Sequence, residues 1–128
     1  MLARLSTTAL IGLVAHPVGV EVDIGRGLPS VTVVGLGDAA VLQARDRVRA
    51  AFGNSGFDWP DRRVIVSLSP ADLPKQGSGF DLPIAIGLLA SAGLVPPTAL
   101  EGLWAIGELG LGGDLRPVIW DWVVTFVL

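Results

Sequence analysis

Residues 67–87 read SLSPADLPKQGSGFDLPIAIG, and this stretch joins two apolar segments of the chain. Apolar residues alternate with polar ones up to Leu68, which is typical of a strand. After a glycine-serine-glycine triplet, Pro83 fits the first turn of a helix, where its missing N–H is not needed. We therefore expect a strand, a sharp corner and a buried helix over residues 81–92, with Asp81 as the N-cap.

The other segments extend this pattern of strands and helices. Apolar residues alternate on both sides of His16 and Pro17, so two strands joined by a turn at these residues are expected. Asp38 precedes a run without proline or glycine and is the predicted N-cap of a first helix. The expected elements are strands over 5–13, 18–24, 31–34 and 64–68, a helix over 38–52, a further strand over 103–106 and a hairpin around 110–118. This order predicts an α/β or α+β class.

The composition limits the possible functions. The chain has 128 residues, which suits one domain, and 51% of them are hydrophobic while 16% are charged. A net charge of −3 disfavours a protein that coats nucleic acid through charge alone, so any such contact would be local. With no cysteine and a single histidine, disulfides and the usual zinc clusters are excluded.

The corner contains the residue types of a phosphate-binding loop. Such a loop needs the order G-x-x-x-x-G-K-S/T at the mouth of a helix, whereas here Lys75 precedes Gly77, Ser78 and Gly79. The positive end of the following helix would attract an anion, but the Asp81 carboxylate already stands there. The residue order therefore disfavours nucleotide binding by this chain alone.

A serine-lysine hydrolase is the second chemical interpretation. Lys75 is the only lysine, so it would have to be the base. The candidate nucleophiles are Ser67, Ser69 and Ser78, and no second ordering group stands at a recognisable spacing. A Ser-His-Asp triad would depend on His16, whose place at a predicted turn indicates a solvated residue. We assign no catalytic, cofactor-binding or metal-binding residue.

Arginines near the first helix form a possible contact patch. Arg45 and Arg49 are one turn apart and share a helix face, and Arg62 and Arg63 follow at the next predicted turn. These four residues are candidates for contact with DNA or with another subunit. The simpler interpretation is a solvated face with local pairing to Asp46. The four tryptophans are not interleaved with basic residues, so a stacking platform for single strands is not indicated.

Five segments resemble the N-terminal domain of the ComM/YifB family of magnesium-chelatase-like AAA+ ATPases. They are VEVDIGRGLP (20–29), VVGLGDAAV (33–41), RDRVRAAFGNSGF (45–57), SPADLPKQGSGFDLPIAIGLLASAG (69–93) and GELGLGGDLRPV (107–118). The resemblance implies a ribosomal-protein-S5-domain-2-like fold, related to the Lon protease domain, with a left-handed crossover and a mixed sheet covered on one face by two main helices. It makes Asp72, Lys75, Gly77, Ser78, Gly79, Phe80 and Asp81 the family's signature corner.

The resemblance also implies a setting for the domain. In the family it precedes an AAA+ motor that forms homo-hexamers on branched DNA and drives branch migration in recombination and natural transformation. ATP and Mg²⁺ belong to that motor, and no Walker A or Walker B pattern follows residue 118. We therefore expect no cofactor for this chain, no membrane partner and a cytoplasmic location. A Lon-like Ser-Lys peptidase relic and a stand-alone DNA-binding module remain alternatives.

The last ten residues depart from the family pattern. Residues 1–118 are the expected domain, whereas residues 119–128 read IWDWVVTFVL, an apolar tail with two tryptophans. A truncation or a frameshift is the expected origin of this tail. It would either pack as an extra strand or remain exposed.

Overall fold

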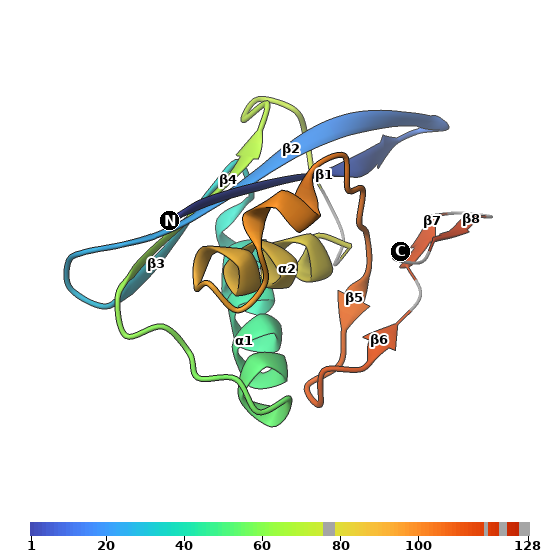
Figure 1. The fold of residues 1–128 in the computed structure, drawn as a ribbon. Coiled ribbons are helices and arrows are strands. Elements are labelled where there is room, and N and C mark those ends of the chain that lie inside the picture. The colour runs from blue at the N-terminus through green and yellow to red at the C-terminus, as the bar shows by residue number, and fades with distance from the viewer. Residues whose placement is uncertain (76–78, 117, 121–122, 126–128) are drawn as a thin grey trace.

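The computed structural model describes residues 1–75, 79–116, 118–120 and 123–125. Figure 1 shows the arrangement of its helices and strands. They are β1 (Leu2–Ile11), β2 (Val14–Gly25), β3 (Ser30–Val34), α1 (Asp38–Asn54), β4 (Arg63–Ser69), α2 (Asp81–Ser91), a 3-10 helix (Pro97–Leu100), β5 (Glu108–Leu109), β6 (Leu115–Arg116), β7 (Val118–Trp120) and β8 (Val123–Thr125).

The first four strands form one mixed sheet in the spatial order β1-β2-β4-β3. β1 pairs with β2 and β2 pairs with β4 in the antiparallel sense, while β3 lies parallel to β4. Parallel neighbours need a crossover connection, and α1 provides it. The predicted α/β class with a mixed sheet is confirmed. The narrower likeness to ribosomal protein S5 domain 2 and the left-handed crossover stay predictions.

Both helices lie on one face of the sheet, as Figure 1 shows. Alternate strand residues point toward them and form the core, because successive side chains of a strand face opposite sides. The side chains with at most 1% of their surface exposed include Val20, Val22, Val64, Val66 and Leu68. The helices thus close the core that the alternation in the sequence predicted.

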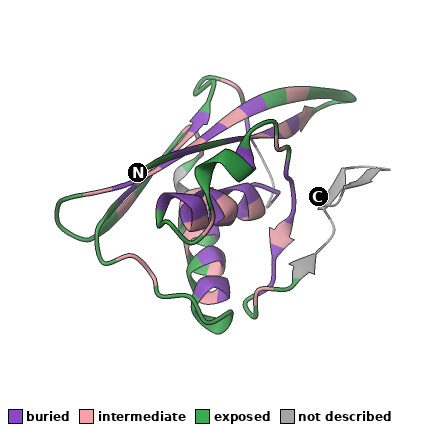
Figure 2. Ribbon diagram, in the orientation of Figure 1, coloured by how far each residue is buried: buried purple, intermediate pink, exposed green. Residues whose placement is uncertain are grey.

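The second helix is buried on most sides, which its apolar sequence predicted (Figure 2). Gly87 lies against β2 so closely that a Cβ there would be 2.5 Å from a methyl group of Val22. At the end of α2, the Ser91 hydroxyl accepts the Ile24 N–H at 3.0 Å and donates to the Met1 carbonyl. Tight packing and a buried polar anchor therefore fix α2 against the sheet.

The turn between the first two strands was predicted at the wrong place. It is formed by Gly12 and Leu13, since Ile11 pairs with Val14, and Gly12 has the positive φ of 61° that glycine adopts most readily. His16 and Pro17 lie inside β2 instead. The missing N–H of Pro17 is tolerated there because β4 begins to pair with β2 only at residue 19.

The predicted strand over residues 103–106 is also wrong. Trp104 makes a single bridge to β1, in which Ser6 donates to the Leu103 carbonyl at 3.0 Å and accepts the Ala105 N–H at 2.9 Å. The hairpin predicted around residues 110–118 is present as β5 and β6, which pair in the antiparallel sense. The glycine-rich turn joins two strands of only two residues each.

Both helix starts differ by one residue from the prediction. α1 begins at Asp38 and α2 at Asp81, so the N-caps are Gly37 and Phe80, and neither cap makes a side-chain hydrogen bond. A shift of one residue is common at helix ends, but at α2 it frees the Asp81 carboxylate for other partners.

The predicted apolar tail lies partly outside the described residues, which omit 121–122 and 126–128. Its described backbone forms the antiparallel pair of β7 and β8. Within the described chain, every helix is too short or too polar to span a lipid bilayer.

Candidate functional site

The signature corner centres on the carboxylate of Asp81, the first residue of α2. Arg47 of α1 donates from Nε to Oδ2 at 2.6 Å and from Nη2 to Oδ1 at 3.0 Å. The Leu109 N–H of β5 donates to Oδ2 at 3.2 Å. The Asp81 side chain is 1% exposed and that of Arg47 is 24% exposed. One buried carboxylate therefore joins α1, α2 and β5.

The environment of Asp81 shifts the ionisation of both partners. Burial raises the pKa of Asp81 above its ordinary value, and the hydrogen bonds from Arg47 oppose that rise. The hydrogen bond to Asp81 in turn raises the pKa of Arg47. Because the carboxylate stands at the first turn of α2, it repels any anion that would approach this helix end. Arg47 pairs this charge, so the described start of α2 presents a neutral ion pair.

Backbone hydrogen bonds complete the corner. The Gly107 N–H donates to the Gly79 carbonyl at 2.9 Å, and the Leu82 N–H donates to the Gly107 carbonyl at 3.1 Å. Gly79 and Phe80 are buried beside Asp81. Gly77 and Ser78 lie outside the described residues. The described part of the corner thus ties the start of α2 to the segment that leads into β5.

Lys75 is buried with its ammonium group turned onto its own loop. Its Nζ donates to the carbonyls of Pro70 at 2.5 Å and Leu73 at 3.0 Å. Burial lowers the pKa of Lys75, and the nearby charge of Asp72 opposes this. Asp72 is exposed and lines an open hollow with Gly35 and other loop residues. The lysine therefore ties together residues 70–75, the described segment that follows β4.

The candidate nucleophiles lie apart from this lysine where they are described. Ser67 and Ser69 flank the buried Leu68 and so point to the sheet face away from the helices. The Ser69 hydroxyl lies against β2, where a Cβ on Gly19 would be 3.0 Å from it. Among the described residues, no serine hydroxyl is hydrogen-bonded to Lys75. A Ser-Lys pair is thus not assembled in the described chain.

Two of the four candidate arginines share a hollow. Arg45 and Arg49 of α1 line an open hollow of about 410 Å³ together with Ser30, Trp59 and Asp61. The Arg49 guanidinium lies 5.7 Å from the centroid of the Trp59 ring, within cation–π range. Arg45 also pairs with Asp46 at 3.6 Å, as the simpler interpretation predicted. The hollow therefore combines two cations, an indole ring and a carboxylate.

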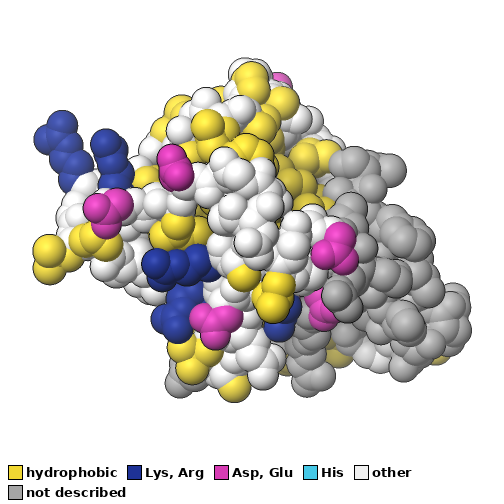
Figure 3. All heavy atoms as spheres, turned by 90° about the horizontal axis from the view of Figure 1, so that it is seen from below, with side chains coloured by type: hydrophobic (Ala, Val, Ile, Leu, Met, Phe, Trp, Pro, Cys, Tyr) yellow, Lys and Arg dark blue, Asp and Glu magenta, His cyan; other side chains and the backbone are white. Residues whose placement is uncertain are grey.

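The other two arginines are not among the residues that line this hollow. The Arg62 carbonyl accepts the Ser30 N–H at 3.4 Å, and the Arg63 side chain runs past Gly27 in the loop before β3. Figure 3 shows the face of the molecule seen from below, where Lys and Arg side chains stand in separate groups with Asp and Glu side chains near them. The arginines thus form a mixed patch and not one basic surface.

Sequence reasoning missed the pairing of Arg47 with Asp81. A helical wheel contains the signal, because residue 47 precedes the core residue Val48 and is four residues before the core residue Ala51. An arginine at the edge of a core face either extends its guanidinium to water or meets an acidic partner. Its partner lies 34 residues away, so the pair itself could not be read from local spacing.

Among the described residues, His16 and the possible metal ligands form no cluster that could hold a metal ion. His16 faces Ala9 across the β1–β2 pair and is half-buried. In the part of the chain that the structure describes, no three His, Cys, Asp or Glu side chains gather where they could hold a metal ion.

Sequence comparisons relate this chain to known proteins. The family described as subunit ChlI of Mg-chelatase matches residues 20–123. The chain is 47% identical to the protein YifB of Salmonella typhimurium and 44% identical to the competence protein ComM of Haemophilus influenzae, in each case over 117 residues. These matches cover 91% of this chain and 23% of each relative.

The mixed sheet covered on one face by two helices makes this chain an α/β domain. The chain belongs to the family of subunit ChlI of Mg-chelatase, and it matches the N-terminal part of the larger YifB and ComM proteins. It spans about a quarter of the length of these relatives.

Proposed function

We propose that this chain acts as the non-catalytic N-terminal domain of a ComM/YifB-type AAA+ ATPase. In this role it supports a hexameric, ATP-driven motor that moves DNA branches during recombination and natural transformation in the cytoplasm. The observation that carries the proposal is 44–47% identity over 91% of the chain to the N-terminal part of ComM and YifB.

The polar groups of the corner support a role without chemistry. Arg47 and the Leu109 N–H occupy the Asp81 carboxylate, and two carbonyls occupy the Lys75 ammonium. A general base or nucleophile needs access to substrate, and both Asp81 and Lys75 are buried. In this proposal the domain contributes a folded surface, and ATP and Mg²⁺ bind to the motor.

A chimera tests the proposal. In ComM of Haemophilus influenzae, the matching 117 residues would be replaced by this chain, and ATP hydrolysis and branch migration would be compared with those of ComM and of ComM lacking the segment. We expect the chimera to keep branch migration that the deletion loses. A chimera as inactive as the deletion, although folded, would contradict the proposed role. Calorimetric titration of the isolated chain with Mg–ATP should give no binding heat.

The arginine hollow favours a second, compatible function, which is direct contact with branched DNA. Arg45 and Arg49 present two cations beside the Trp59 ring, a combination suited to a phosphate with an adjacent base. Replacing both arginines by alanine should weaken salt-dependent binding to a four-way junction. Arg4→Ala is the matched control, since Arg4 is exposed and pairs with Glu21 on the opposite sheet face. If the double variant and the control bind the junction as well as the wild type, the proposed DNA contact at this hollow is wrong.

A further inference from the structure

The β1–β2 hairpin ends in an exposed apolar tip, defined here as residues 10–15. All six residues of this tip, LIGLVA, are apolar or glycine. Leu13 is 73% exposed, Val14 58% and Ile11 36%. β4 pairs with β2 only from residue 19 onward, so the tip belongs to a two-stranded ribbon that extends past the sheet (Figure 1).

This ribbon lacks the charged side chains that commonly protect an exposed strand pair. Residues 5–20 contain no Asp, Glu, Lys or Arg, whereas charged residues commonly guard exposed strand edges. A two-stranded ribbon is marginally stable in water, and contiguous exposed aliphatic side chains mark interaction sites. The tip therefore has the character of a contact element that is completed by another apolar surface.

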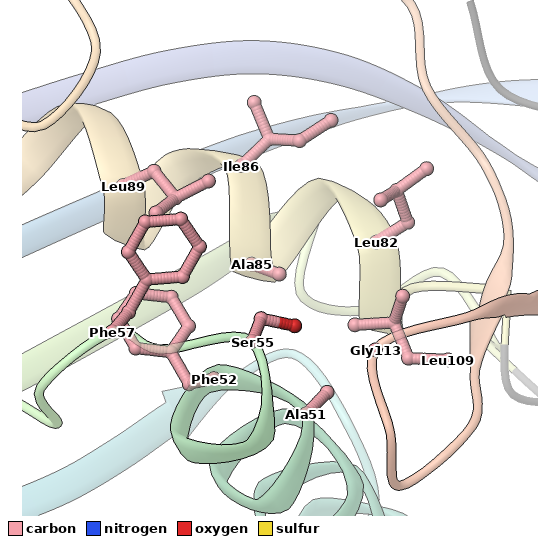
Figure 4. Close-up of a pocket in the computed structure, with 10 residues that line it drawn as sticks. All are labelled: Ala51, Phe52, Ser55, Phe57, Leu82, Ala85, Ile86, Leu89, Leu109 and Gly113. Atoms are coloured by element: carbon pink, nitrogen blue, oxygen red, sulfur yellow. The ribbon is translucent and has the colours of Figure 1, made fainter.

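The same chain carries a complementary apolar hollow at a different place. It has a volume of about 160 Å³ and lies between α1, α2 and the turn after β5 (Figure 4). Its lining includes Phe52, Phe57, Ile86, Leu89 and Leu109, and the only polar side chain among the lining residues is that of Ser55. No residue of the tip is among those that line the hollow.

We propose that the tip of one copy inserts into the hollow of a second copy, with Leu13 as the inserted side chain. An apolar projection and an apolar hollow at separate places on one chain make a head-to-tail contact, which leaves one tip and one hollow free after each addition. Such a contact builds rings or filaments and not closed two-fold dimers. The inference rests on the proposed assembly role and names the surfaces through which copies would meet.

Two single substitutions test the contact in the purified chain, with light-scattering mass measured as a function of concentration. Leu13→Asp places a charge in the apolar hollow, and Leu89→Lys places one in its wall. Each should weaken association by more than about tenfold. Leu28→Asp is the matched control, because Leu28 is 87% exposed in the loop between β2 and β3, and it should associate like the wild type.

Mixing the variants shows which surfaces meet. A Leu13→Asp chain keeps a sound hollow and a Leu89→Lys chain keeps a sound tip, so an equimolar mixture should form a 1:1 dimer that neither forms alone. Association of Leu89→Lys alone at wild-type strength would indicate tip-to-tip contact and overturn the proposal. A wild-type chain that stays monomeric at every concentration, or that associates only on phosphatidylglycerol vesicles, would overturn it as well.

The folded state is checked separately. Leu13 is in an exposed turn, so Leu13→Asp should keep the wild-type circular dichroism spectrum and can be judged even if Leu89→Lys does not fold. When the Leu13→Asp chain is added in excess to the wild type, it should shorten the assemblies, because its hollow binds a wild-type tip but its own tip binds nothing. If these experiments fail, only the proposed contact between tip and hollow is refuted. The ComM chimera tests the proposed role of the domain independently of that contact.

Discussion

The corner at the start of α2 and the outer side of α1 both carry ionisable residues, yet they use them differently. At the corner, Asp81 and Arg47 are largely buried and bound to each other. On the outer side of α1, Arg49 is exposed and Arg45 is half-buried, with an exposed Asp46 as its ion-pair partner. The corner thus uses charge to hold elements together, while the outer side keeps charge available for a partner.

The region with the more specific sequence motif is not the region that offers exposed charged groups. The corner holds the more specific sequence motif, but its buried ionisable groups, Asp81 and Lys75, are hydrogen-bonded within the fold. The arginines of α1 form no specific motif, although they line an open hollow. A motif that is needed to join elements is constrained in every residue, whereas an electrostatic contact surface requires only the right charge at roughly the right place.

Arg47→Ala should have the largest effect on stability. It leaves the Asp81 carboxylate buried without its cation, and breaking a buried pair in this way costs about 3–5 kcal/mol. Urea unfolding measures the loss. The control is Arg4→Ala, which breaks the exposed pair of Arg4 with Glu21 at 2.8 Å and should cost at most about 1 kcal/mol. Equal losses for the two variants would contradict a buried lock at the corner.

A pair of glycine substitutions compares the two helices. Gly87→Ala in α2 places a Cβ 2.5 Å from a methyl group of Val22 and should destabilise by about 1–3 kcal/mol. Gly53→Ala in α1 meets nothing within 4 Å and should stabilise by about 0.5–1 kcal/mol. Thermal unfolding of both variants gives the signs. A stabilising Gly87→Ala would mean that α2 is packed less tightly than its burial indicates.

Lys75 should make the stability of the fold depend on pH in the alkaline range. Burial lowers the pKa of Lys75 in the folded chain, so the unfolded chain binds more protons between that pKa and the ordinary value of 10.5. The stability contribution of this lysine therefore rises as pH rises through that window. The wild type should gain stability relative to Lys75→Met between pH 7 and pH 10 in urea unfolding. A constant difference would indicate an unshifted lysine.

The double variant Arg45→Ala with Arg49→Ala should change stability least. Both side chains lie at an open hollow, and substitutions at such positions usually change stability by less than about 0.5 kcal/mol. The expected change is in junction binding and in its salt dependence, measured by titration at several salt concentrations. A large loss of stability would indicate that these arginines help to hold the fold together, as Arg47 does, and are not only a contact surface.

Some parts of the fold could be predicted because their signals are local. The alternation that ends at Leu68 and the apolar run around Ile84 indicated a strand followed by a buried helix, and both are present. The turn at Gly12 was missed because Pro17 is the stronger turn signal along the sequence. Proline is accepted inside β2 only because the ribbon lacks a third strand there, which is a tertiary property.

The sequence by itself determined the class of the fold, the two helices, most strands and the family, because periodicity and a long motif are properties of neighbouring residues. The tertiary structure alone decided how the side chains are used. Asp81 meets Arg47 across 34 residues, Lys75 turns onto its own loop, and Trp59 joins Arg49. Such contacts depend on how the helices, strands and loops pack in space, and the spacing of residues along the sequence does not give the distance between them.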